Sequence, residues 1–584
     1  MTEYKTPGVY VKEISKFPPS VAGVATAIPA FIGVTEKGPS KSPVKIKSLL
    51  DFQEKFGYGP TLRVDNDGKL QNHKFVLYDS IRLFYDNGGG ICYVVSIGNY
   101  DSTEFDADLY EEALTPLKKV DEVTLLVAPD AAMLLDDVSQ LGTVHIAMLT
   151  QCADLGDRFA ILDPQLNVSL DNALNTFRTK VGNNHLSYGA AYYPFLKTTY
   201  TKSISFDEMV KIGDIKAKVE QIGLYNDYYA KTDKELAFGI VQGKLLEGYK
   251  KALEKYNKEI QLLSKEIEEL KKDEATNKDA IKAKEKAKKD IETARDNSDE
   301  KKQFDEFGKF SINDKGELLY SNAAITDKTF EASDNPKKEA NPIGKKVYET
   351  ILSEIGNEIP EITNKKALMA KAFATQIDGY AEKLAEKLAE ASIIPPSGAI
   401  AGIYAATDGS KGVWQAPANV SVAAVADVTE LISDKDQENM NVDAATGKSV
   451  NAIRFFTGKG ILVWGARTLD GNSNEWRYVP VRRLFNYIEE SVQKSTNWAV
   501  FQPNDANTWV KIQCQIENFL INLWRDGALA GSTPDKAFYV KVGLDVTMTA
   551  DDINNGYLIV EIGLAAVRPA EFIVLKFSHK VQES

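Results

Sequence analysis

The chain has 584 residues, of which 43% are hydrophobic and 26% charged, proportions typical of globular proteins with several domains. Its net charge of −13 argues against a nucleic-acid-binding protein, which would present a broad basic surface. The longest apolar runs, 21–33 and 420–428, are shorter than the roughly 20 residues that cross a bilayer, and the N-terminus lacks the apolar core of a signal peptide. We therefore expect a protein that is made and folded in a cytoplasm, with no membrane insertion.

The N-terminal residues 4–14 alternate apolar and polar side chains around Pro7-Gly8. This pattern predicts an extended arm that ends in a short strand. Because Pro7 has no backbone N–H, the strand should lie at a sheet edge or begin after the proline.

The next part of the chain alternates strand-like and helical patterns. Strands are predicted at Ala30–Val34, Cys92–Ile97 and Thr124–Ala128, and a helix is predicted within Lys74–Asn87. Strands that alternate with helices indicate an α/β or α+β domain.

The middle of the chain carries a heptad seam. Its apolar residues recur at spacings of three and four, namely at Leu246, Tyr249, Leu253, Tyr256, Ile260, Leu263, Ile267 and Leu270. The pattern breaks at 273–277 and then resumes weakly. We interpret it as an antiparallel helical hairpin; the alternative is one long helix that pairs with another subunit.

Polar residues follow the seam. Residues 297–342 are predicted to form a loosely ordered connection, and helices are predicted at 344–356 and 365–391. The prolines at 395–396 should end the last helix. Residues from about 235 to 392 thus form a mostly helical insertion.

The C-terminal block is predicted to be compact and mixed. In chain order the expected elements are helices at 482–496 and 507–525, strands at Phe538–Asp545 and Tyr557–Ala565, and a terminal strand at Glu571–Phe577. Between the two central strands, Thr549–Asp552 resembles a capping box that opens a short helix. The terminal strand, like the N-terminal one, has no hairpin partner next to it in sequence.

Catalytic and ligand-binding motifs are weak. The glycine-containing segments Gly88–Gly90, Gly447–Ser449 and Gly458–Gly460 each lack part of a phosphate- or dinucleotide-binding pattern and are interpreted as turns. The four histidines are scattered, and the three cysteines are isolated in apolar settings and interpreted as buried. We therefore expect no catalytic activity, no cofactor and no metal.

Several longer motifs carry a family resemblance. They are Thr6–Val11, Gly412–Asn419, Ala452–Thr468, Trp476–Leu484, Leu523–Gly531 and Val567–Phe572. In identity and order these motifs resemble the tail sheath proteins of contractile phage tails and related injection machines.

The resemblance implies a multidomain α+β fold. Residues 1–35 and 395–584 would form the sheath core domain with a mixed sheet and helices. Residues 36–235 would form an inserted α/β domain, and 236–394 an outer helical insertion.

The resemblance also implies a structural function. The subunit would polymerise as stacked rings around an inner tube and contract to drive that tube through a target envelope. Its partners would be further copies of itself, the inner tube protein, and baseplate and terminator or cap proteins. Neighbouring subunits would be linked by exchange of terminal strands, for which the candidate residues are Tyr4, Val9, Tyr10, Val11, Phe572, Ile573, Val574, Leu575 and Phe577.

A group of arginines lies within the family-like block of this acidic chain. The candidates for a surface that faces the inner tube are Arg467, Arg477, Arg482, Arg483 and Arg525. Such charges would steer and register a partner. The competing interpretation is that they form intramolecular salt bridges.

Two further alternatives stay open. The chain could be a non-contractile baseplate or adhesin module that uses the same arms. Among contractile machines, one chain with both family ends argues against a type VI sheath, which is usually split between two polypeptides, and favours an extracellular phage-tail-like device.

Overall fold

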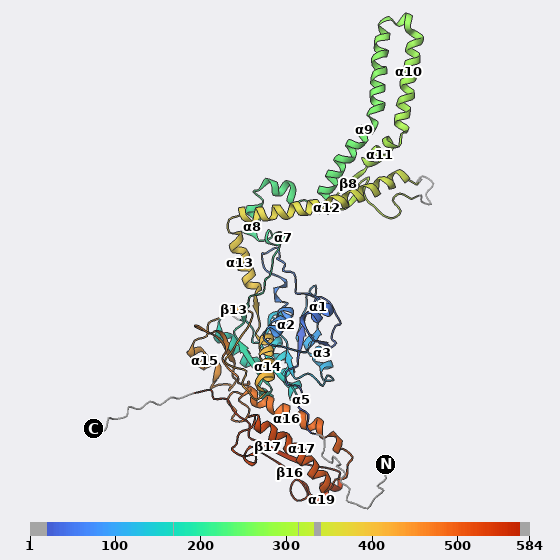
Figure 1. Cartoon of the computed structure of the whole chain (residues 1–584). Coiled ribbons are helices and arrows are strands. Elements are labelled where there is room, and N and C mark those ends of the chain that lie inside the picture. Colours follow the sequence, from blue (N-terminus) through green and yellow to red (C-terminus); the bar gives the residue numbers. More distant parts are fainter. Residues whose placement is uncertain (1–19, 167–168, 314, 332–339, 573–584) are drawn as a thin grey trace, which may run out of the picture. The chain divides into compact units, whose positions relative to one another are not determined.

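The computed structural model describes residues 20–166, 169–313, 315–331 and 340–572. Their contacts divide them into two compact units. The sheet unit contains residues 20–63, 70–204 and 386–572, and the helical unit contains residues 64–69 and 205–385. Figure 1 shows the elements of both.

A nine-stranded sheet forms the centre of the sheet unit, in the order β12-β15-β14-β6-β5-β4-β1-β3-β2. The strands are β1 (Pro29–Gly33), β2 (Val44–Ile46), β3 (Cys92–Ser96), β4 (Leu125–Val127), β5 (Phe159–Leu162), β6 (Gly189–Tyr193), β12 (Val420–Ser421), β14 (Asn451–Phe456) and β15 (Gly460–Val463). The pairs from β3 through β14 are parallel, whereas β2, β15 and β12 at the two ends are antiparallel. The predicted strands at Ala30, Cys92 and Thr124 are confirmed as β1, β3 and β4.

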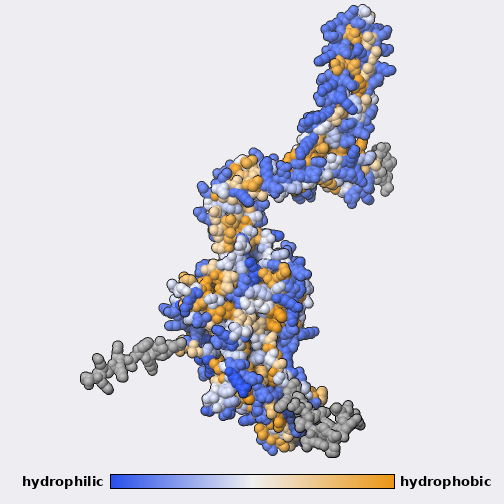
Figure 2. All heavy atoms as spheres, viewed as in Figure 1, coloured by the Kyte–Doolittle hydropathy of each residue, from blue (hydrophilic) through white to orange (hydrophobic). Residues whose placement is uncertain are grey.

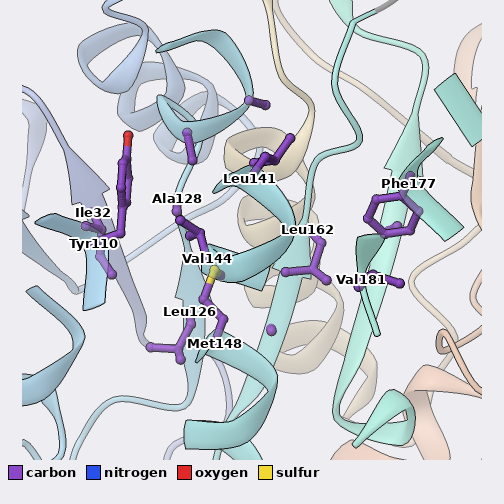
Figure 3. Close-up of a cluster of buried hydrophobic side chains, with 14 of the residues drawn as sticks. Ile32, Tyr110, Leu126, Ala128, Leu141, Val144, Met148, Leu162, Phe177 and Val181 are labelled. Atoms are coloured by element: carbon purple, nitrogen blue, oxygen red, sulfur yellow. The ribbon is translucent and has the colours of Figure 1, made fainter. Parts of the chain in front are cut away.

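Helices cover both faces of this sheet. On one face lie α3 (Ala107–Leu117), α5 (Val138–Leu155) and α6 (Leu170–Lys180), whose side chains meet Ile32, Leu126 and Leu162 in one core (Figure 3). On the other face lie α1 (Leu49–Phe56), α2 (Leu77–Asp86) and α14 (Ser397–Lys411), which pack against Phe31 and Val127. Burial on both faces explains why the parallel strands read as continuous apolar runs.

The helix α14 has no counterpart in the sequence predictions. It is buried over most of its length, so its Ala- and Gly-rich sequence lacks the polar face by which an amphipathic helix is recognised. A Cβ at Gly398 would lie 2.4 Å from the Ser80 carbonyl oxygen, and one at Gly402 would lie 2.4 Å from that of Phe84. These glycines therefore permit α14 to approach α2 closely.

Smaller elements complete the sheet unit. A three-stranded sheet has the order β11 (Ile393–Ile394), β7 (Leu196–Thr198) and β13 (Val425–Val428). The short helices α4 (Ala131–Leu134) and α15 (Asp434–Asn441) lie at loops of the main sheet.

The C-terminal part of the sheet unit, the C-terminal subdomain, has its own hydrophobic core. It contains α16 (Val479–Thr496), α17 (Ala506–Arg525), α18 (Pro534–Ala537), β16 (Phe538–Val542), α19 (Ala550–Asn554) and β17 (Val560–Leu564). The two predicted helices and the two central strands are confirmed. The predicted capping box is also present, because Thr549 Oγ1 accepts from the Asp552 N–H and Asp552 caps Thr549 in return.

The helical unit contains the predicted hairpin, formed by α9 (Asp233–Leu270) and α10 (Glu274–Asn297). Ion pairs join Glu266 to Lys284 at 2.6 Å and Lys271 to Glu285 at 3.2 Å, as expected for antiparallel arms. Within the seam Leu253 and Ile267 are buried, while Leu263 is half-buried. Hydrophilic side chains dominate the visible face of the hairpin (Figure 2).

Two predictions in this unit are wrong. Residues 297–342 were expected to be a loose connection, but they include α11 (Asp299–Phe307) and the strands β8 (Phe310–Ile312), β9 (Leu318–Tyr320) and β10 (Ala323–Ala324). Phe307, Phe310 and Phe330 pack there into a core that the polar composition concealed.

The helices that follow also differ from the prediction. One helix, α12 (Pro342–Gln376), continues through Pro360, and α13 (Tyr380–Ala391) begins only after a break at Gly379. The helical unit also contains α7 (Phe206–Met209), α8 (Gly213–Val219) and a π-helix at Tyr225–Tyr229.

The compact units divide the chain differently from the boundaries expected at 35, 235 and 394. Strands β2 to β6 lie in the segment assigned to an inserted α/β domain, yet they share one sheet with β14, β15 and β12 from the C-terminal block. The link is the parallel pairing of Asn451 with Tyr192 and of Ala452 with Tyr193. A pairing between residues so far apart in sequence leaves no local pattern.

Candidate interaction surfaces

The glycine-containing motifs occupy turns. Gly458 (φ +78°) and Gly460 (φ +81°) form the tight connection between β14 and β15. Gly447 (φ +73°) also turns the chain, but the neighbouring Lys448 is buried, and its Nζ donates a hydrogen bond to the Arg178 carbonyl oxygen at 2.5 Å. A lysine held in this way is not positioned for a phosphate group.

The buried titratable groups include Asp163 and His145. Burial raises the pKa of Asp163 to about 7, although the hydrogen bonds that it accepts from Ser397 lower it. Burial lowers the pKa of His145 to about 3. Within the ranges that the structure describes, no three His, Cys, Asp or Glu side chains gather where they could hold a metal ion.

Two other expectations can be compared with the structure. Cys92 and Cys152 are buried as expected, but Cys514 on α17 is exposed. In the described part of the chain, no helix is both long and apolar enough to cross a membrane.

The antiparallel strands β16 and β17 form a sheet of their own in the C-terminal subdomain. They pair in register from Phe538 opposite Leu564 to Val542 opposite Val560. Among the described residues no third strand joins them. An isolated two-stranded sheet is marginally stable, and each of its strands lacks a partner strand on its outer side.

Apolar side chains surround this small sheet at the surface. Tyr539, Val546, Tyr557 and Ile559 are exposed, and hydrophobic surface is visible near α19 (Figure 2). A groove of about 450 Å³ lies beside the start of β17, lined by residues 545–549 and 559–561. An open strand edge with an apolar border is suited to receiving a further strand.

The candidate strand-exchange residues fall mostly outside the described residues. These are Tyr4, Val9, Tyr10, Val11, Ile573, Val574, Leu575 and Phe577. Phe572, the last described residue, is 73% exposed. Their exchange with a neighbouring subunit stays a prediction.

The candidate tube-facing arginines separate into two groups. Arg467, Arg482 and Arg483 have side chains that are 5% exposed or less, and each pairs with a carboxylate of the same chain. These three do not face outward, which corrects the prediction for them. The sequence could not distinguish them because ion pairing depends on partners that are distant along the chain.

The other two arginines reach the surface. Arg477 is half-buried, and its Nε donates to the Gly471 carbonyl oxygen at 3.1 Å. Arg525 lies exposed in the last turn of α17. The tube-facing hypothesis is retained for these two.

Arg482 illustrates the internal use of these charges. Its Nε donates to Asn486 Oδ1 at 2.7 Å, its Nη2 lies 3.1 Å from Glu489 Oε2, and its guanidinium stacks 4.1 Å from the Trp476 ring. The hydrogen bond and the ion pair lie within α16, whereas the stacking on Trp476 connects α16 to the segment that precedes it.

Sequence reasoning missed the partners of Arg467 and Arg483. Glu571 forms an ion pair with Arg467, in which Arg467 Nη2 lies 2.6 Å from Glu571 Oε2. Asp408 forms an ion pair with Arg483, in which Arg483 Nη2 lies 2.5 Å from Asp408 Oδ2. Burial raises the pKa of Glu571, but hydrogen bonds from Arg467 and Asn441 lower it by more, so that it lies below its usual 4.5. The available signal for this carboxylate was its place in the motif Val567–Phe572.

A large groove borders the same segment. Its volume is about 1070 Å³, and Val442, Trp464, Tyr478, Pro569 and Phe572 line it together with Arg454. Phe572, the last described residue, therefore lies at a groove that is lined by both apolar and polar side chains.

Known proteins with similar sequences are tail sheath proteins. The model of the family described as the phage tail sheath C-terminal domain matches residues 472–580. A tail sheath protein of Vibrio phage KVP40 is 25% identical over 191 residues, and that of Enterobacteria phage T4 is 24% identical over 127 residues. The matches cover 32% and 22% of this chain, and only 26% and 19% of the length of these relatives.

The similarity in fold to solved structures extends over almost the whole chain. A chain of the extracellular contractile injection system PVC, from its sheath complex in the contracted state, is 24% identical with a TM-score of 0.52, and the match covers 100% of this chain and 99% of that one. A chain of the anti-feeding prophage helical sheath in the contracted state is 23% identical with the same TM-score, and the match covers 99% and 100%. Residues 472–580 thus match the phage tail sheath C-terminal domain by sequence, and the chain is similar in fold, over almost its whole length, to these sheath chains.

Proposed function

We propose that this protein is the structural subunit of a contractile sheath, which polymerises as stacked rings around an inner tube and contracts to drive it through a target envelope. The observation that carries the proposal is the match of its fold, over almost the whole of both chains, to sheath chains from contracted injection particles. The proposed role is structural and requires no catalysis, cofactor or metal.

Strand exchange is proposed as the link between subunits. The β16–β17 sheet offers open edges, and the sequence places strand-like segments at 4–14 and 571–577 without local partners. A strand donated by a neighbour would satisfy backbone groups at these edges while leaving the two folded bodies free to rotate. Such links could persist while the contacts between bodies change.

The energy for contraction would come from the assembly itself. An extended lattice that is trapped above its most stable packing can release free energy once triggered, because the favoured state makes better contacts between subunits. Such a mechanism requires no nucleotide.

The proposed partners follow from this role. They are further copies of the chain, the inner tube protein, and baseplate and terminator or cap proteins. Arg477 and Arg525 are the proposed tube-facing charges, and the hairpin of the helical unit is proposed to lie on the outside of the sheath. Subunits would be made in the bacterial cytoplasm and would act in a phage tail or, as we favour, in an extracellular injection particle.

Electron microscopy of the purified protein, with and without tube protein, tests this proposal. We expect helical tubes of stacked rings, and we expect them to be lost when residues 1–12 or 573–584 are deleted. If both deletion variants form and contract sheaths normally, strand exchange is wrong. If the intact protein forms only single closed rings or monomers, the alternative of a non-contractile baseplate or adhesin module is correct.

A further inference from the structure

The first and last described segments of the sheet unit each end beside a buried arginine. We name these segments the N-terminal root, residues 20–27, and the C-terminal root, residues 567–572. Arg483 contacts the first root and Arg467 the second. Both arginines lie in the motifs that carry the family resemblance, and neither faces outward.

The C-terminal root is held through the side chain of Glu571. Arg467 binds it in a bidentate manner, with Nε 2.9 Å from Oε1 and Nη2 2.6 Å from Oε2. Asn441 Nδ2 donates to Oε1 at 2.7 Å, and the Tyr478 hydroxyl donates to Oε2 at 3.1 Å. Three elements thus hold one carboxylate directly before the chain leaves the described fold.

The arginine in this contact is itself fixed. Its backbone N–H donates to Asn451 Oδ1, and its carbonyl oxygen accepts from Asn451 Nδ2, both at 2.8 Å. Its Nη1 also donates to the Asn441 carbonyl oxygen at 3.0 Å. Because Asn451 begins β14, the carboxylate is connected through Arg467 to the central sheet.

The N-terminal root is held through its backbone and one hydroxyl. Arg483 Nη2 donates to the Thr26 carbonyl oxygen at 2.8 Å, and Thr26 Oγ1 donates to Asp408 Oδ2 at 2.6 Å. Asp408 on α14 in turn pairs with both terminal nitrogens of Arg483. Upstream, the N–H of Val24 donates to Ser491 Oγ on α16 at 3.2 Å.

Charged pairs of this kind are sensitive to the loss of one partner. Removing Glu571 would leave a guanidinium that is 4% exposed without its counter-ion, and an unpaired buried charge costs far more than a surface ion pair contributes. Bidentate pairing also fixes direction, since the planar guanidinium accepts a carboxylate in one orientation. At the C-terminal root the bidentate contact therefore fixes the orientation of the Glu571 side chain.

We propose that Arg467 and Arg483 are positioning residues that fix the roots of the two terminal arms to the sheet core, so that tension carried by an exchanged strand is transmitted into the folded body. This inference rests on the proposed strand exchange. Without the contacts of Arg467 and Arg483, tension on an arm would first detach its root from the rest of the sheet unit.

The first test measures hydrogen exchange in the full-length protein. Glu571→Ala should accelerate exchange of the amides at 565–572 by about tenfold or more, since each 1.4 kcal/mol lost from local opening is a factor of ten. The matched control is Glu489→Ala, which removes the carboxylate that pairs with Arg482 within α16, a pair that includes no residue of either root. Unchanged exchange at 565–572 in Glu571→Ala would overturn the inference.

The second test measures assembly. Sheaths of Glu571→Ala should form less well and break at lower urea concentration than those of the wild type and Glu489→Ala, by more than the loss of monomer stability in the same variant accounts for. Glu571→Gln, which keeps the shape and loses the charge, should fall between them and serves if the alanine variant does not fold. If the sheaths of Glu571→Ala and Glu571→Gln weaken only in proportion to the loss of monomer stability, the contact has an ordinary structural role and the inference is overturned.

Deletion of residues 573–584 distinguishes a failure of the positioning role from a failure of the proposed strand exchange. If the deletion variant assembles normally, the proposed C-terminal strand exchange is wrong. If the deletion prevents assembly but Glu571→Ala assembles like Glu489→Ala, strand exchange stands and the positioning role is overturned. At the N-terminal root, Thr26→Val removes only the hydroxyl contact to Asp408 and should produce a smaller effect of the same kind.

Discussion

The sheet unit and the hairpin of the helical unit are held together in different ways. In the sheet unit, a strand at 189–193 pairs with one at 451–456, and buried groups such as Asp163 bind residues more than 200 positions away. In the helical unit, α9 packs against α10, its neighbour in sequence, along a seam that is partly exposed. The sheet unit, from which the proposed strand-exchanging arms extend, therefore depends on long-range packing, whereas the hairpin depends on a local heptad repeat.

The same leucine truncation should reveal this difference most strongly. Leu126→Ala in β4 removes a side chain that is fully buried between two helix layers and should cost the sheet unit about 3–5 kcal/mol. Leu263→Ala in the half-buried seam should cost the helical unit about 1 kcal/mol. Calorimetry that resolves the transition of each unit measures both, and equal costs would contradict the comparison.

The dependence of stability on pH should also differ between the units. The pKa of Asp163 is raised from its usual 3.8 to about 7, so the unfolded chain loses this proton at lower pH than the folded one. The sheet unit should therefore lose stability as pH rises from about 4 to about 7, by as much as about 4 kcal/mol from this group.

Asp163→Asn provides the control for this pH effect. The amide cannot ionise, yet it can still accept from the Ser397 N–H and donate to the Ser397 hydroxyl. Melting temperatures measured across this pH range should thus fall less steeply in the variant. An unchanged slope would show that Asp163 is not the group responsible.

Glycine substitutions should change stability in opposite directions in the two units. At Gly398 a Cβ would lie 2.4 Å from the Ser80 carbonyl oxygen, so Gly398→Ala should destabilise the sheet unit by about 1–3 kcal/mol. In α9, Gly248 has open space around it, and Gly248→Ala should stabilise the helical unit by about 0.5–1 kcal/mol. Thermal denaturation of the two variants checks both signs.

The smallest effect is expected at the surface of the hairpin. Lys284 and Glu266 are both largely exposed, and such pairs contribute about 0.5 kcal/mol or less. Lys284→Met should therefore change hairpin stability little, and the difference should vanish in high salt. A loss above about 2 kcal/mol would show that this ion pair, rather than the apolar seam, holds the arms together.

Particular residues show how much of this structure could be read from the sequence. The heptad from Leu246 to Leu270, the strands at Ala30 and Cys92, and the capping box at Thr549 each leave a local pattern, and each is confirmed. Helix α14 and the connection around Phe310 were missed because their packing partners lie far along the chain or because polar neighbours hide a small core.

The arginines make the same point for the candidate surfaces. Motif position identified them as important, but only the fold shows that Arg467 binds Glu571 and Arg483 binds Asp408. The side-chain direction of a charged residue depends on which counter-charge is within reach, and that depends on the tertiary structure. Family motifs therefore located these residues without assigning their role.

Cryo-electron microscopy of assembled sheaths, in the extended and in the contracted state, tests the proposed mechanism most directly. We expect residues 573–584 of one subunit to lie as a strand against the β16–β17 sheet of a neighbour in both states, while the contacts between folded bodies differ. A map in which this strand is paired within its own subunit, or in which it leaves its neighbour on contraction, would contradict the account.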